Sequence, residues 1–185
     1  MTAKVRQRTL MPNLVLPADQ LGQAPTMASG ITNEAQPLVI RRERIVLDGV
    51  TVAITAALDY VAQELLTLAN TNAIIFGTVV NLVGVGDGTG VDTIENVDIA
   101  VGTVATTSTD FSNAGEDNLC EKIDLTAAGV GQGDSLDNTT PALVFVGAAA
   151  DNKIYLNMAC AITADGSVTF TGTIDVFWAD LGVAS

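Results

Sequence analysis

The chain has 185 residues, of which 48% are hydrophobic and only 4% aromatic, and its formal net charge is −13. This length supports one domain with a buried core, and the apolar content excludes a compositionally disordered chain. The acidic balance argues against binding to nucleic acid or to an anionic membrane surface. No apolar run reaches the ~18 residues of a membrane-spanning helix, and the N-terminus lacks the apolar stretch of a secretion signal.

Residues 1–37 are predicted to form an extended N-terminal arm ahead of a domain that spans residues 38–185. Four of the five prolines punctuate this segment, and proline suits extended backbone but removes hydrogen bonds from a strand interior. Six of the eight Lys and Arg residues, but only three of the 21 Asp and Glu residues, lie within residues 1–44. A basic front end can lie on an acidic surface, including another copy of the acidic body, or it can be an ordinary solvated tail. The six cations are Lys4, Arg6, Arg8, Arg41, Arg42 and Arg44.

The first part of the domain contains one clear strand and one ambiguous segment. Asp48-Gly49 predicts a turn, and a strand is predicted over residues 50–55. Apolar residues within 56–70 follow helical spacing, yet the same stretch also fits an irregular strand from Tyr60 to Leu68. Periodicity alone favours the helix.

A mostly buried strand is predicted from Ile74 to Val83, followed by a flexible glycine-rich loop at 84–90. Three short strands and two polar loops are predicted next. The strands are 94–101, 103–107 and 120–125, and the loops are 108–118 and 127–141.

The C-terminal part has the clearest pattern, because residues 153–163 and 168–178 each alternate between two faces. Such alternation is typical of half-buried antiparallel strands, and Asp165-Gly166 between them predicts a tight hairpin. A lone hairpin leaves its apolar face in water, so it must pack on a second sheet. With a further strand at 142–147 and frequent turn signals, the sequence predicts an all-β fold, an antiparallel β-sandwich of jelly-roll type preceded by the arm.

Catalytic chemistry is poorly supported, because the sequence contains no histidine, the commonest general base. Gly133–Leu136 spells the signature of the GDSL esterases, but that chemistry needs a histidine to activate the serine. Loop 84–90 reads G-x-G-x-G-x-G, which is not the spacing of a nucleotide-binding loop. We therefore expect no enzyme activity, no catalytic residue and no cofactor.

Two groups of carboxylates are close enough in sequence to surround Ca²⁺, although neither matches an EF-hand loop. Ordinary surface charge on an acidic protein is the simpler explanation, so no metal site is predicted. The groups are Asp87, Asp92, Glu95 and Asp98, and Asp110, Glu116 and Asp117.

The two cysteines, Cys120 and Cys160, fit neither a redox pair nor a zinc ligand set. Cys160 lies on the apolar face of its predicted strand and is expected to be buried as a small hydrophobe. The separation of the two cysteines in sequence permits a disulfide between them, but without a secretion signal we do not expect one.

Five segments resemble virion structural proteins of tailed phages, especially marine ones: Glu64–Leu68, Ile74–Leu82, Ala142–Gly147, Ile154–Ala159 and Gly166–Trp178. In those proteins a "YLN" strand and a "T-x-T-G-T-I" strand close a jelly-roll-like sandwich. The resemblance covers roughly residues 45–180 and consists of strand and turn patterns rather than catalytic signatures. It implies a strand at 61–69 and a capsid-associated role, and it assigns no functional residues.

The resemblance and the charge pattern together predict a capsid cement or decoration protein on the exterior of the virion, assembled in the host cytoplasm. The expected partners are the major capsid protein and further copies of this chain, and the three-fold sites of icosahedral lattices suggest a trimer. Arg41, Arg42 and Arg44, with the cations of the arm, are expected to make salt-sensitive interface contacts. The alternatives are a head-fibre base, a tail or baseplate component, or a carbohydrate-binding adhesion module.

Overall fold

The computed structural model describes residues 40–68, 72–91, 97–125, 129–134, 144–146 and 152–181. The predicted arm lies outside these residues, so its boundary stays a prediction. The described residues form nine strands, and no helix in them could cross a membrane. The strands are β1 (Ile40–Ile54), β2 (Tyr60–Thr67), β3 (Ala73–Gly86), β4 (Val97–Gly102), β5 (Cys120–Asp124), β6 (Val130–Asp134), β7 (Val144–Val146), β8 (Lys153–Cys160) and β9 (Gly166–Asp180).

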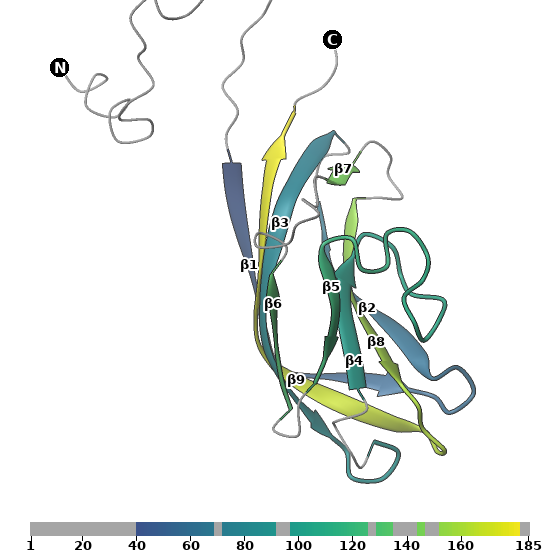
Figure 1. Cartoon of the computed structure of the whole chain (residues 1–185). Helices are drawn as coiled ribbons and strands as arrows, with labels where there is room; N and C mark the ends of the chain where they lie inside the picture. Colours follow the sequence, from purple (N-terminus) through teal and green to yellow (C-terminus); the bar gives the residue numbers. More distant parts are fainter. Residues whose placement is uncertain are drawn as a thin grey trace, which may run out of the picture. The chain divides into compact units, whose positions relative to one another are not determined.

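The strands form two antiparallel sheets, which confirms the predicted all-β sandwich (Figure 1). The five-stranded sheet has the order β1-β9-β3-β6, and β7 pairs with β3 beside β6. The four-stranded sheet has the order β2-β8-β4-β5. Strand β2 settles the ambiguous segment in favour of a strand, as the resemblance implied.

The core lies between the two sheets and is built mainly from aliphatic side chains. On β9, the predicted inward face is buried from Val168 and Phe170 to Trp178. On β8, Ile154, Leu156 and Met158 are likewise buried. Since burying each large apolar side chain contributes ~1.5–3 kcal/mol, this shared layer supplies the main stabilisation of the sandwich.

The predicted hairpin between the last two long strands is wrong. Strand β8 pairs with β2 and β4, whereas β9 pairs with β1 and β3, so the chain passes from one sheet to the other at residues 161–165. Both strands carry a continuous apolar face, and placing them in opposite sheets turns both faces toward one core. Gly166 pairs with Ile54 instead of forming a hairpin turn.

The predicted turn at Asp48-Gly49 is also wrong, because β1 continues through it as one strand of 15 residues. The pairing with β9 shifts between Asp48 and Val50, and Gly49 has a φ of 70°. An extra glycine in the left-handed region is what a β-bulge needs, so the same dipeptide bends the strand without reversing it.

Three smaller predictions change as well. Residues 103–107 are not a strand, the expected loop 127–141 contains β6, and the glycine-rich stretch from Gly84 to Gly86 belongs to β3. The strand predicted at 94–101 is confirmed from Val97 onward as β4, and the one at 120–125 is confirmed as β5.

Candidate functional site

Three of the cations predicted to make interface contacts lie at the beginning of β1, on the margin of the five-stranded sheet (Figure 1): Arg41, Arg42 and Arg44. Arg42 donates from Nε and Nη2 to Oδ1 and Oδ2 of Asp175, at 3.0 and 2.6 Å. Arg44 donates from the same atoms to the same two oxygens, at 2.8 and 2.9 Å. The ladder makes this possible, since Arg44 lies directly opposite Asp175 on β9. One carboxylate therefore holds two guanidinium groups.

This arginine cluster keeps a net positive charge, because two cations share one anion. The side chain of Asp175 is only 8% exposed, whereas those of Arg42 and Arg44 are 48% and 53% exposed. Hydrogen bonds from Arg44 and Arg42 hold the pKa of Asp175 well below its usual range, and Asp175 raises the pKa of Arg44. The outward halves of both guanidinium groups remain available to solvent.

Two aromatic rings support the same cluster. The guanidinium carbon of Arg41 lies 5.3 Å from the ring centroid of Trp178, and that of Arg42 lies 5.9 Å from the centroid of Phe177. Both distances are in the range of cation–π attraction. The structure thus gives all three arginines partners within the chain, and their interface role stays a prediction. Lys4, Arg6 and Arg8 lie outside the described residues.

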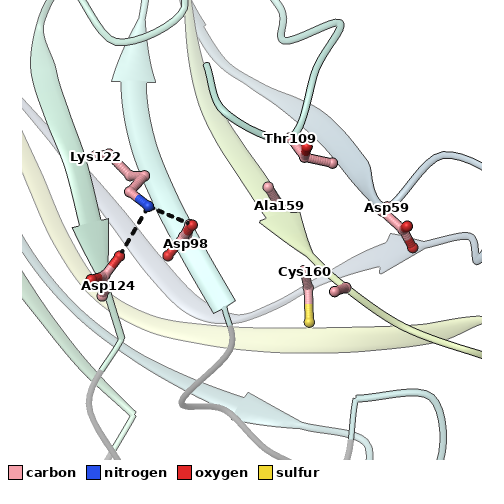
Figure 2. A pocket seen from close by; sticks show the side chains of 8 residues that line it. Asp59, Asp98, Thr109, Lys122, Asp124, Ala159 and Cys160 are labelled. Atoms are coloured by element: carbon pink, nitrogen blue, oxygen red, sulfur yellow. Dashed lines mark hydrogen bonds and ion pairs between the residues drawn. The ribbon is translucent and has the colours of Figure 1, made fainter. Parts of the chain in front are cut away.

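A hollow of about 630 Å³ opens on the four-stranded sheet (Figure 2). Lys122 on β5 lies between two carboxylates, 2.9 Å from Asp98 on β4 and 3.4 Å from Asp124. Asp98 and Asp124 are paired residues of the ladder between these strands. The hollow is lined by Asp59, Asp98, Thr109, Lys122, Asp124, Ala159, Cys160 and Ala161.

Lys122 pairs with both Asp98 and Asp124, so one cation balances only part of the charge of these two carboxylates. Burial raises the pKa of Asp98, and its hydrogen bond with Asp124 raises it further. The same hydrogen bond, with the charge of Lys122, lowers the pKa of Asp124. Asp59 uses Oδ1 to accept the backbone N–H of Ile162. These contacts bind a lysine and close a turn, and they do not place a base beside a nucleophile.

A buried glutamate organises the long loop between β4 and β5. Glu116 accepts the backbone N–H groups of Thr107 and Asn113 at 2.6 and 3.1 Å, and side-chain donors from Thr107, Ser108 and Asn113 surround it. Burial acts to raise the pKa of Glu116, but these hydrogen bonds outweigh it and the pKa is lowered. Its oxygens are therefore already satisfied by the loop.

Asn157 on β8 fixes the same loop to the outer side of the four-stranded sheet. It accepts the backbone N–H of Thr106 at 3.0 Å and donates to the carbonyl groups of Val104 and Glu116. Phe111 of the loop packs with Ala100 and Ala159 in a small second cluster. Asn157 thus holds a loop that covers this sheet, and Glu116, which was interpreted from the sequence as ordinary surface charge, is buried in that loop.

Asp87 closes the turn that follows β3. Its Oδ1 accepts the backbone N–H groups of Thr89, Gly90 and Val91, and its Oδ2 accepts that of Ser167. Hydrogen bonds from these amides lower the pKa of Asp87 to about 2. The amides that a phosphate would require are thus taken by a side chain of the protein.

The other candidates are the two cysteines and the remaining acidic residues, of which Asp110 is exposed and Asp117 is half-buried. Cys120 and Cys160 are both buried and are not joined in a disulfide. Within the described ranges, no group of three His, Cys, Asp or Glu residues is placed to hold a metal ion. Asp92 and Glu95 of the first acidic group, and Ser135 of the GDSL string, lie outside those ranges.

Comparison with known proteins finds weak structural similarity to a phage capsid chain. No family model matches the sequence, and no curated protein matches it significantly. A chain of the cyanophage Pam1 capsid asymmetric unit is 19% identical to this one, over 89% of this chain and 99% of that chain, with a TM-score of 0.37. A TM-score this low does not establish a shared fold.

Proposed function

We propose that the protein is a structural component of a phage virion, a cement or decoration protein that binds the exterior of the capsid. Its partners are the major capsid protein and other copies of itself, and it contacts neither nucleic acid nor a membrane. The resemblance of five segments to tailed-phage virion proteins supports this role. The acidic body supports it too, because like charge keeps particles from adhering to each other and to nucleic acid.

The observation that carries the proposal is that key polar side chains form hydrogen bonds within the chain itself. Glu116, Asn157, Asp87 and Asp175 each accept or donate several hydrogen bonds within the chain. Groups committed in this way fix loops and sheet margins, and they are not poised for acid–base or nucleophilic chemistry. A body in which these four polar side chains serve its own rigidity suits a building block.

The basic front end provides the contact with the capsid lattice in this proposal. Its cations precede an acidic body, so they can bind carboxylates of the capsid protein while the body faces solvent. Such contacts lie near the surface and weaken with added salt.

The test is incorporation of variants into particles. Replacing Lys4, Arg6 and Arg8 by Ala should lower the number of copies per particle at low salt, and the difference from wild type should shrink at higher salt, where the same contacts are screened in wild type. Replacing Thr2, Gln7 and Thr9 by Ala removes as many side chains from the same segment without changing charge and serves as the control. Equal occupancy for both variants contradicts docking through the arm. Hundreds of copies per particle indicate a lattice component, whereas a handful indicates a tail or a portal vertex.

A further inference from the structure

Strand β1 forms one margin of the five-stranded sheet and pairs on one side only, with β9, among the described strands. In Figure 1 its first half is the dark blue ribbon beside the yellow C-terminal end of β9. Residues Ile40–Asp48 run without irregularity up to the bulge at Gly49. A long regular edge presents unpaired backbone N–H and C=O groups, which are a template for pairing with another strand.

Two features that normally protect such an edge do not protect β1: proline is absent, and the arginine side chains are directed away from the edge. Natural edges carry proline or projecting charges, but residues 40–54 contain no proline. Arg42 and Arg44 are drawn over the sheet to Asp175 on β9, and Arg41 lies over Trp178. Between Arg44 and Asp48 the edge presents the uncharged run Ile45–Leu47. Its Val46 is 64% exposed, the highest value among the exposed large hydrophobic residues that the structure describes.

We propose that this edge of β1 pairs antiparallel with the same edge of a second copy, across a two-fold axis beside Val46. The two five-stranded sheets then continue as one sheet. The inference rests on the self-association in the proposed function and names the surface responsible. It predicts an even-numbered assembly rather than a trimer.

Charge complementarity supports this partner and this register. With Val46 opposite Val46 of the second copy, Arg44 of each chain lies opposite Asp48 of the other. Glu43 then lies opposite Gly49, so no like charges meet. Moving the axis to Arg44 would place two arginines face to face, which is destabilising.

Arg44 uses two of its five N–H donors on Asp175, so donors remain for a second carboxylate. Asp48 forms no ion pair within the described part of the chain.

The pairing also covers apolar surface. It buries the two copies of Val46 against each other on the outer face and brings Ile45 beside Leu47 of the second copy on the inner face. Backbone hydrogen bonds provide affinity in strand addition, and alternate side chains provide specificity.

Site-directed crosslinking of the full-length protein tests the register. Val46→Cys should form a disulfide-linked dimer at least ten times faster than Val85→Cys under mild oxidation. Val85 is the matched control, because it is 62% exposed on the same sheet but lies on the interior strand β3. Both native cysteines are buried and remain in the background of both variants. Equal rates, or no dimer from Val46→Cys, overturn the proposal.

Sedimentation of a second pair of variants measures the association itself. Val46→Arg should raise the Kd for dimerisation at least ~100-fold, equivalent to ~2.8 kcal/mol at ~1.4 kcal/mol per tenfold, whereas Val85→Arg should change it less than ~3-fold. Circular dichroism confirms that both variants fold. A trimeric mass unaffected by Val46→Arg refutes the two-fold contact. A different result, the absence of the protein from purified particles, would contradict the proposed virion role without bearing on the β1 contact.

Discussion

Replacing Asp175 by Asn tests the electrostatic arrangement at the beginning of β1. The substitution preserves the shape of the side chain but removes the negative charge that holds Arg42 and Arg44. Four charge-assisted hydrogen bonds, between 2.6 and 3.0 Å, lose their ionic acceptor. The two positively charged guanidinium groups then still repel each other, and no anion between them offsets this repulsion.

The size of the effect follows from exposure. Both arginines are about half exposed, so water resolvates them and each broken pair costs only ~0.5–1 kcal/mol. Asp175 itself is nearly buried, but an Asn can still donate and accept there. The free energy of unfolding should therefore fall by ~1–2 kcal/mol at pH 7, with most of the loss shared between two bidentate pairs.

The pH dependence separates charge from shape. The pKa of Asp175 is lowered in the folded state, so its stabilising effect is complete above the unfolded pKa of ~3.9 and is lost as the pH falls toward the folded pKa. Urea unfolding of wild type and Asp175→Asn should differ by a constant amount between about pH 5 and 8, and the difference should shrink below about pH 4. A difference that persists unchanged in acid would refute the electrostatic explanation. In an Arg44→Gln background the loss should be smaller, because one of the two pairs is already absent.

Three further predictions concern the fold. Gly172→Ala should lower the free energy of unfolding by ~3 kcal/mol or more, because the φ of Gly172 is 142° and a Cβ there would lie 2.2 Å from the carbonyl oxygen of Asn81. Gly88→Ala is the control: Gly88 has a φ of 74°, but no atom lies within 4 Å of an added Cβ, so urea unfolding should show a loss of only ~1 kcal/mol. Equal losses would exclude the steric argument. Asn157→Leu should cost ~2–4 kcal/mol and accelerate amide exchange throughout loop 103–119, since it leaves buried backbone groups unsatisfied; exchange confined to one amide would contradict its role in fixing the loop. The carboxyl of Asp87 should titrate near pH 2 by NMR. A midpoint near 4 would show that the backbone amides do not donate hydrogen bonds to this carboxylate in solution.

Strand positions could be predicted from the sequence where alternation was long. The inward faces of β8 and β9 were predicted correctly from period two alone, because that period depends on local backbone geometry. The neighbour of each strand could not be predicted in this way. An apolar face is buried equally well beside its sequence neighbour or across the sandwich, and the chain uses the second arrangement.

Glycines misled the sequence-based prediction in β1 and in β6. At Gly49 it permits a bulge where the dipeptide Asp48-Gly49 indicated a turn. In β6, a Cβ at Gly131 would lie 2.6 Å from Cδ2 of Leu125, and one at Gly133 would lie 2.6 Å from Cδ1 of Ile123. Strand β6 was read as a loop because glycine has low strand propensity, yet here it allows close approach of the two sheets.

The arginine cluster was only half predictable. Arg42 and Arg44 are two residues apart, which places them on one face of any strand, and Asp175 is the one acidic residue in the alternating stretch 168–178. These signals predict a charged contact on a sheet surface. Their pairing joins residues more than 130 positions apart, and only the ladder between β1 and β9 brings them together.

The most direct test of the proposed role is a reconstruction of the purified particle at a resolution that shows strands. We expect the two-sheet body on the outer surface of the capsid lattice, in hundreds of copies, with its front end in contact with the major capsid protein. Density for the protein inside the shell, or its absence from the lattice, would contradict that role.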